Sequence, residues 1–258
     1  MKIAVSGKGG VGKTTLCAAL SLLMARKGVE VLAVDADPDA NLACALGIPS
    51  DEQKKIIPIS EQKALIEERT GAKVKQYGQI FQLNPEVSDI SEKYAYKYNG
   101  VGLLVLGGIE QGGSGCACPE NVLIKALISD IILNKNQTIV MDMEAGIEHL
   151  GRATTRGVDV MLIVAEPGQH SVDSTKRIIA LSKEIGLKKI LVAANKIESE
   201  DDEKFIRDSF PGINLIGFIP YTGEIRSSDR NDQSVLDNLN KDNINIFNGI
   251  LEEIEALA

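Results

Sequence analysis

The stretch of sequence that decides the fold is Gly7-Lys8-Gly9-Gly10-Val11-Gly12-Lys13-Thr14, which lies between an apolar run and a helical pattern. It fits two phosphate-binding patterns, the dinucleotide fingerprint G-x-G-x-x-G and the longer loop G-x-x-x-x-G-K-[ST]. Lys13 and Thr14 favour the second, because a triphosphate needs a positive charge for its β and γ oxygens and a hydroxyl for Mg²⁺. The sequence therefore predicts a nucleoside triphosphate site with contacts from Gly9, Gly10, Val11, Gly12, Lys13, Thr14 and Thr15.

Short apolar runs bounded by Gly, Asn or Asp recur along the chain, and helical patterns separate them. The predicted strands are Lys2–Ser6, Val31–Asp35, Gly102–Leu106, Thr138–Asp142, Val158–Ala165, Ile190–Asn195 and Leu215–Pro220. The predicted helices are Thr14–Lys27, Glu120–Leu133, Val172–Ile185, Asp202–Ser209 and Ile244–Ala258. Runs that are apolar throughout are typical of strands buried on both faces of a parallel sheet. We therefore predict an α/β fold with a doubly wound, mostly parallel sheet, and a single domain over residues 1–258 because no linker interrupts the pattern.

Composition excludes several classes of protein. The 258 residues include 28 Lys and Arg against 36 Asp and Glu, a net charge of −8, and no basic run is long enough for a nucleic-acid stripe. No stretch approaches the roughly 18 consecutive apolar residues of a membrane span. The 4 cysteines are too few for a disulfide framework in a chain of this length. We expect a cytoplasmic protein with reduced thiols and with neither nucleic acid nor membrane as a partner.

Residues 48–100 depart from the alternation of strands and helices. A helix is expected from Ile59 to about Thr70, and the remainder is polar, with 3 of the 5 tyrosines within Tyr94–Tyr98. A connection of this length is rarely a bare loop in a compact domain. Two interpretations stay open: a helical and irregular insertion that covers the sheet edge, or a surface that docks a partner or a second copy of the chain.

Two aspartates stand at the ends of buried strands. Asp35 ends the second predicted strand and Asp142 ends the fourth. Because the carboxyl ends of parallel strands meet at one edge of the sheet, both carboxylates should lie beside the bound phosphates. Together with the Thr14 hydroxyl they predict an oxygen-rich site for Mg²⁺, bound directly or through water.

Lys8 extends the phosphate loop to K-G-G-x-G-K-[ST]. With it the chain resembles the deviant Walker A class of P-loop ATPases, which includes MinD and the nitrogenase iron protein. The resemblance implies a homodimer in which Lys8 reaches the partner's ATP, so that Lys8 and Lys13 are both catalytic. The alternative for Lys8 is an ordinary solvated loop lysine.

Further segments resemble the switch segments of that class. They are Asp35-Ala36-Asp37-Pro38-Asp39 and Asp142-Met143-Glu144-Ala145-Gly146. The resemblance implies that Asp37 orients the water that hydrolyses ATP to ADP and phosphate. Asp39, Glu144 and Glu148 stay open as alternatives for that role.

The base of the nucleotide is expected near the end of a later strand. Asn195-Lys196 resembles the adenine-contacting pair of the class, and Pro220 its usual second wall. An amide can both donate to and accept from a base edge. Glu198 stands where a guanine-binding protein would carry Asp, so ATP is favoured over GTP.

The segment Gly112-Gly113-Ser114-Gly115-Cys116-Ala117-Cys118-Pro119 carries two closely spaced thiols. Cysteines separated by one residue make a strained disulfide but a reasonable bidentate chelate for a soft or borderline ion. One chain supplies two thiolates, whereas a closed site usually needs four, so a two-fold dimer would complete a site for Ni²⁺ or Zn²⁺. The alternative is a pair of small buried residues near a helix start.

These motifs, with the string Asp142–Arg152, together resemble the CooC and AcsF accessory ATPases over essentially the whole chain. That resemblance implies a dimerising metallochaperone ATPase that assists nickel insertion into carbon monoxide dehydrogenase or acetyl-CoA synthase. One alternative is an iron–sulfur carrier or electron-transfer ATPase that uses the same cysteines. Another is a positioning ATPase of the MinD or ParA kind, which the acidic composition disfavours.

Overall fold

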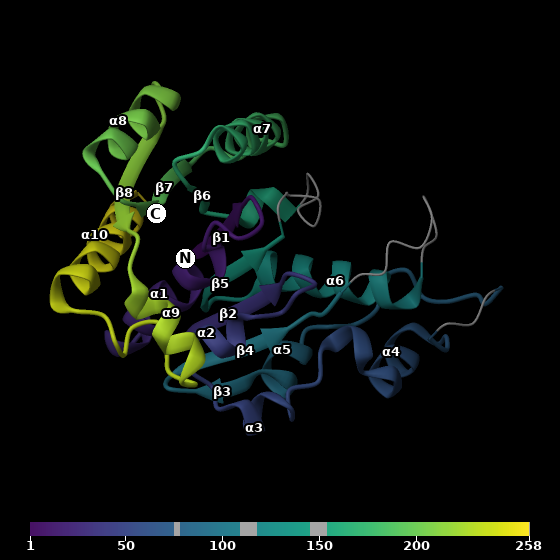
Figure 1. Ribbon diagram of the computed structural model, residues 1–258. Coiled ribbons are helices and arrows are strands. Elements are labelled where there is room, and N and C mark those ends of the chain that lie inside the picture. Colours follow the sequence, from purple (N-terminus) through teal and green to yellow (C-terminus); the bar gives the residue numbers. More distant parts are fainter. Residues whose placement is uncertain (75–77, 109–117, 145–153, 258) are drawn as a thin grey trace.

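The computed structural model describes residues 1–74, 78–108, 118–144 and 154–257 (Figure 1). Within them one sheet has the strand order β3-β4-β2-β5-β1-β6-β7-β8, and only β3 runs antiparallel to its neighbour. The strands are β1 (Lys2–Gly7), β2 (Val31–Ala36), β3 (Tyr96–Tyr98), β4 (Val101–Val105), β5 (Thr138–Met143), β6 (Val160–Ala165), β7 (Ile190–Ile197) and β8 (Asn214–Pro220). The α/β class and the doubly wound, mostly parallel sheet are as predicted.

Helices cover both faces of the sheet. They are α1 (Lys13–Arg26), α2 (Leu42–Ala45), α3 (Ser50–Gln53), α4 (Lys63–Thr70), α5 (Ile90–Tyr94), α6 (Pro119–Asn134), α7 (Gln169–Glu184), α8 (Glu200–Ser209), α9 (Gly223–Arg230) and α10 (Lys241–Leu257), with 3₁₀ turns η1 (Ile59–Glu61) and η2 (Thr154–Gly157). α1, α2 and α10 pack on one face, and α4, α6, α7 and α8 pack on the other. None of the helices in the described ranges is long and apolar enough to cross a membrane.

Two separate hydrophobic clusters explain why the strands read as continuous apolar runs. In β6, Met161 and Ile163 belong to the cluster beneath α6 and α7, whereas Leu162 and Val164 belong to the cluster beneath α1 and α10. Successive side chains of a strand point to opposite faces, so a strand covered on both faces must be apolar at every position. The sheet is therefore the middle layer of three.

Residues 48–100 add an edge strand that the sequence analysis did not predict. β3 pairs antiparallel with β4, with Tyr96 opposite Leu103 and Tyr98 opposite Val101. The Tyr98 hydroxyl donates to the carbonyl of Gly47 at 2.7 Å, and the Tyr96 hydroxyl bonds the Glu52 carboxylate. Part of this segment thus extends the sheet, and these two tyrosines bond residues of their own chain.

Candidate nucleotide site

The glycine-rich loop leaves β1 in the middle of the sheet and leads into α1. β1 lies between β5 and β6, so the loop emerges where strands on both sides end at the same edge. Gly12 caps α1 with a left-handed φ of 98°, a conformation that L side chains rarely adopt. The turn directs the first N–H groups of α1 toward the loop, where a phosphate is favoured by the helix N-terminus.

Lys13 lies at the centre of this edge. Its side chain is 6% exposed, and its Nζ lies 3.7 Å from Asp37 Oδ2. Asp37 Oδ1 in turn accepts a hydrogen bond from the N–H of Asp39 at 3.0 Å. The structure therefore brings the predicted phosphate lysine and the predicted water-orienting carboxylate together, whereas Asp39 and Glu144 are exposed. Glu148 lies outside the described residues.

Asp35 and Asp142 are register partners on β2 and β5 and are fully buried. Asp35 Oδ2 accepts the N–H of Leu42 at 2.9 Å, and Thr14 Oγ1 donates to Asp142 Oδ2 at 2.6 Å. Burial, together with the Asp142 charge, raises the pKa of Asp35 to about 7. Burial raises the pKa of Asp142 to about 6, while Thr14 and Lys13 oppose the rise.

The second carboxylate oxygen of Asp142 tests whether these residues fit a cation. Among the described residues Oδ1 has no hydrogen-bond partner although it is buried. A buried carboxylate oxygen without a partner is costly, and a cation or its water shell would satisfy it. Mg²⁺ is commonly held by one or two carboxylates, waters and substrate phosphates. The oxygen donors of Asp142, Thr14 and Asp35 therefore fit Mg²⁺.

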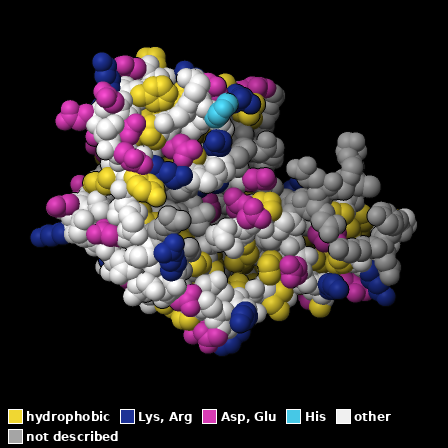
Figure 2. Space-filling model, viewed as in Figure 1, with side chains coloured by type: hydrophobic (Ala, Val, Ile, Leu, Met, Phe, Trp, Pro, Cys, Tyr) yellow, Lys and Arg dark blue, Asp and Glu magenta, His cyan; other side chains and the backbone are white. Residues whose placement is uncertain are grey.

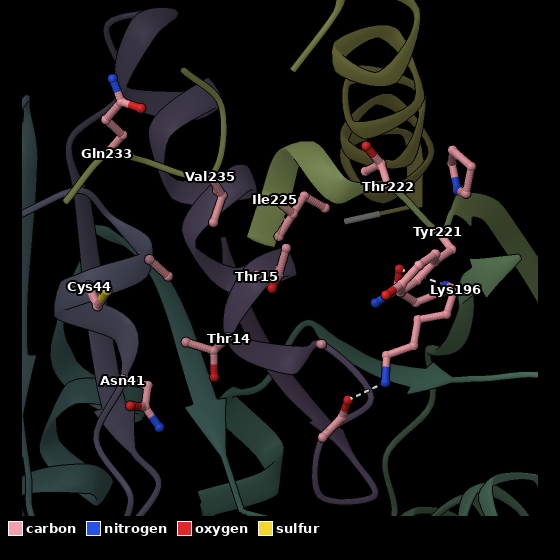
Figure 3. A pocket seen from close by; sticks show the side chains of 15 residues that line it. Thr14, Thr15, Asn41, Cys44, Lys196, Tyr221, Thr222, Ile225, Gln233 and Val235 are labelled. Atoms are coloured by element: carbon pink, nitrogen blue, oxygen red, sulfur yellow. Dashed lines mark hydrogen bonds between the residues drawn. The ribbon is translucent and has the colours of Figure 1, made fainter. Parts of the chain in front are cut away.

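A cavity of about 460 Å³ extends from the phosphate loop toward the end of β8 (Figure 3). It is lined by Gly10, Gly12, Thr14, Thr15, Asn41, Cys44, Ala45, Asn195, Lys196, Pro220, Tyr221, Thr222, Ile225, Gln233 and Val235. The structure thus brings Asn195, Lys196 and Pro220 to the same cavity as the phosphate loop. Sequence reasoning missed the wall formed by α9 and the segment after it, because Ile225, Gln233 and Val235 carry no motif.

Glu166 is a further charged residue at this edge that the sequence analysis did not single out. It directly follows β6, and its Oε2 lies 2.9 Å from Lys196 Nζ. Its Oε1 lies 4.0 Å from the Nζ of Lys8, whose side chain is 44% exposed. A charged residue at the end of an apolar run was the signal that identified Asp35 and Asp142. The same signal could have found Glu166, which directly follows the apolar run of β6.

The predicted metal-binding cysteines are only partly described. Cys118 caps the start of α6, directly before Pro119, and is half-buried, and burial raises the pKa of its thiol. Cys116 lies outside the described residues. Within the described ranges no group of three or more His, Cys, Asp and Glu side chains is placed to hold a metal ion. α6 connects the carboxyl end of β4 to the amino end of β5, so Cys118 lies at the same sheet edge as the phosphate loop.

Basic and acidic side chains are interspersed over the face drawn in Figure 2. Lys27 and Glu255 form an exposed ion pair, with 3.1 Å between Nζ and Oε2. Exposed pairs of this kind contribute little stability. The face is therefore of mixed charge.

Comparison with known proteins places these features in a family. Residues 2–235 match the model of the CobQ/CobB/MinD/ParA nucleotide binding domain. An uncharacterised ATP-binding protein of Methanocaldococcus jannaschii is 45% identical, over 89% of this chain and 88% of its own. The carbon monoxide dehydrogenase accessory protein CooC of Rhodospirillum rubrum is 43% identical, over 89% and 87%.

The fold is also that of solved structures. The septum site-determining protein MinD of Pyrococcus horikoshii, complexed with Mg-ADP, superposes with a TM-score of 0.67 at 23% identity, covering 99% of this chain and 96% of that one. At an identity this low, the comparison shows only that the two proteins share a fold. The predicted MinD-type P-loop fold is confirmed.

Proposed function

This chain belongs to the CobQ/CobB/MinD/ParA nucleotide-binding domain family, and from that membership we propose an ATPase that assists nickel insertion into carbon monoxide dehydrogenase or acetyl-CoA synthase. The accessory role is supported by the 43% identity to CooC. One observation carries the proposal further: Cys118 and the phosphate loop lie at the same edge of one sheet. Events at the nucleotide therefore take place at the sheet edge that also carries one of the two cysteines proposed to hold the metal.

The residues of the loop divide the work on ATP. Backbone N–H groups of residues 9–15 hold the phosphates. When ATP binds, Lys13 leaves its ion pair with Asp37 and contacts the β and γ phosphate oxygens instead. Asp37 is thereby released to orient the attacking water. Thr14, Asp142 and Asp35 would hold Mg²⁺, which supplies positive charge to the phosphates when bound. The base occupies the cavity beside Asn195, Lys196 and Pro220.

We propose that the acting form is a homodimer of single-domain chains. The side chain of Lys8 is half-exposed, and its Nζ lies 4.0 Å from Glu166 Oε1. In the dimer Lys8 would contact the partner's ATP, and Cys116 and Cys118 of both chains would form one four-thiolate site for Ni²⁺ or Zn²⁺ as cargo. Cysteine binds metal as a thiolate and only in its reduced state. Because the cytoplasm keeps thiols reduced, the proposal places this cycle there.

Anaerobic metal analysis tests this function. The purified protein is loaded with Ni²⁺ or Zn²⁺ with and without ATP, and its metal content and absorption spectrum are compared with those of Cys118→Ser. We expect bound Ni²⁺ or Zn²⁺ in the parent and loss of most of it in the variant, because a hydroxyl stays protonated and is a harder ligand. A brown protein with iron and sulfide in place of nickel would show an iron–sulfur carrier instead. Retention of metal by Cys118→Ser would overturn the proposed cargo site.

A further inference from the structure

A pocket of about 280 Å³ lies at the edge of the sheet where β3 begins. Figure 1 shows β3 at this outer edge, beside α3. The pocket shares no lining residue with the nucleotide cavity, so the two are separate. Its lining includes Lys55, Ile57, Lys93, Tyr94, Tyr96 and Val105.

One wall of this pocket is a backbone edge without a partner strand. The β3–β4 ladder ends with Tyr96 opposite Leu103, because α5 ends two residues before Tyr96. The N–H of Leu106 donates to the carbonyl of Asp35 on β2. Alternate residues of a strand bond to opposite neighbours, so Val105 faces away from β2. In the described part of the chain, the N–H and C=O of Val105 therefore have no strand opposite them.

Two exposed apolar side chains border the same pocket. Ile57 is 54% exposed and Tyr94 is 37% exposed. An unpaired strand edge is a template for a further strand, and exposed apolar side chains beside it supply contact area. A segment that pairs with Val105 would bring its own side chains against Ile57 and Tyr94, as in strand addition to a sheet edge.

The charged side chains of the lining are both lysines. Lys93 is exposed, with its Nζ 2.7 Å from Asp89 Oδ2. Lys55 is also exposed, and it has no ion pair among the described residues. Glu52 of α3 does not line the pocket, and its carboxylate bonds the Tyr96 hydroxyl. The charge of the lining is therefore complementary to an acidic segment.

The charge pattern of this chain favours a different protein over a second copy as the occupant. Two acidic stretches of the chain, Glu200–Glu203 and Glu252–Glu255, lie within the helices α8 and α10. The edge strand β8 is extended but carries no acidic residue. These parts of a second copy do not offer an extended acidic strand, and self-association becomes an outcome of the test.

We infer that this pocket docks an extended segment of a partner protein, acidic and apolar in sequence, which adds a strand beside β4 at Val105. The segment would exchange backbone hydrogen bonds with Val105 and place an apolar side chain against Ile57 and Tyr94. Its carboxylates would lie near Lys55 and Lys93. The inference goes beyond the proposed function and does not depend on it, because no residue of the phosphate loop takes part.

Binding of synthetic peptides to the full chain tests this site. The probe is a short fluorescent peptide of alternating glutamate and leucine with blocked ends. One control peptide carries lysine in place of glutamate, and another is methylated on its central backbone nitrogens, which removes their hydrogen-bond donors. Fluorescence anisotropy measures the affinities, and amide NMR spectra report whether the signal of Val105 shifts.

Lys55→Glu is the variant of the site, and Lys54→Glu is its matched control. Both lysines are exposed and adjacent in the sequence, but Lys54 does not line the pocket. We expect about five-fold weaker binding of the acidic peptide for Lys55→Glu, the order of one exposed ion pair, and parental binding for Lys54→Glu. Ile57→Ser should also weaken binding, because it removes apolar contact area. Thermal unfolding monitors the fold of each variant.

The expected result is binding of the acidic peptide, a shifted Val105 amide signal and loss of affinity on backbone methylation. Absence of binding would overturn the inference. Equal weakening by Lys54→Glu, or equal binding of the lysine peptide, would show nonspecific attraction and would also overturn it. A concentration-dependent dimer in sedimentation that Ile57→Ser abolishes would assign the pocket to a second copy and overturn the choice of partner.

Discussion

At the scale of single residues, Lys13 and Asp37 are partners that would separate in the proposed reaction. They lie 3.7 Å apart in this structure, and both side chains are largely buried. ATP would supply a stronger partner for the lysine, since its β and γ phosphates carry more negative charge than one carboxylate. In the proposed reaction the pair would therefore link binding to activation, because the phosphates that attract Lys13 would also release Asp37.

Replacing Asp37 by Asn tests this link. The amide keeps the size of the side chain but loses the charge that accepts a proton from water, so ATP hydrolysis should fall by roughly 10²- to 10⁴-fold while ATP still binds. Phosphate release measured against ATP affinity separates the two effects. Hydrolysis at the parental rate would move the role to Asp39, Glu144 or Glu148.

At the scale of elements, the neighbouring strands β2 and β5 place two buried carboxylates side by side. Asp35 and Asp142 are register partners, and their pKa values are raised to about 7 and about 6. The unfolded chain has ordinary aspartate pKa values, so between about pH 4 and 7 the folded state binds more protons than the unfolded state. The contribution to stability is complete below this range and is lost as the pH rises through it.

The melting temperature of the metal- and nucleotide-free protein should therefore fall between pH 5.5 and 7, the upper part of this range. The expected change is a few degrees, since about 1 kcal/mol shifts the midpoint by roughly 2–4 °C in a chain of this size. Asp142→Asn should flatten the profile, because an amide does not ionise. Asp89, whose pKa is held well below its usual range by Arg69, titrates outside this window and does not interfere. A parental profile that rises with pH would contradict this reading of the pair.

Comparison of particular elements shows what sequence could predict. β6 was predictable because a strand covered on both faces must be apolar throughout. β3 was not, because Tyr96-Lys97-Tyr98 is short and lies at an edge where pairing with β4 decides its structure. In the site, the motif and the strand-end aspartates predicted Lys13, Asp35 and Asp142 correctly as neighbours. The cavity wall at Ile225 and Val235 depends on the packing of α9 and the segment after it against α2, which local pattern does not encode.

At the scale of the whole molecule, two lysines of one loop should have separable effects. Lys13→Ala should abolish binding of ATP and ADP, because it removes the buried charge opposite the phosphates. Lys8→Ala should leave ADP binding in one chain largely intact and impair ATP-driven dimerisation. Calorimetry with ADP and light scattering with ATP measure the two effects. Equal loss of ADP binding in both variants would exclude a role for Lys8 across the dimer.

If a metal site is shared between two chains, the number of ions per dimer and the coupling of metal to nucleotide binding can both be predicted. We expect one metal ion per dimer, bound most tightly in the nucleotide state that favours the closed dimer. Linkage requires that this nucleotide state tighten metal binding by the same factor by which the metal tightens binding of the nucleotide. Titrations of Ni²⁺ or Zn²⁺ with and without ATP, in the slow Asp37→Asn background, measure both factors. One ion per monomer would place the metal elsewhere.

The three-layer arrangement has an evolutionary consequence. The phosphate-loop helix α1 packs into the cluster on one face of the sheet, and α6, which Cys118 begins, packs into the cluster on the other. Substitutions at distant positions that share no side-chain partners, as on the outer sides of these two layers, act on stability almost independently. The layer that contains α6 and Cys118 can therefore change in evolution while the layer that contains the phosphate-loop helix α1 stays the same. Change in one layer alone is thus a route by which proteins with one nucleotide-binding fold can acquire different further functions.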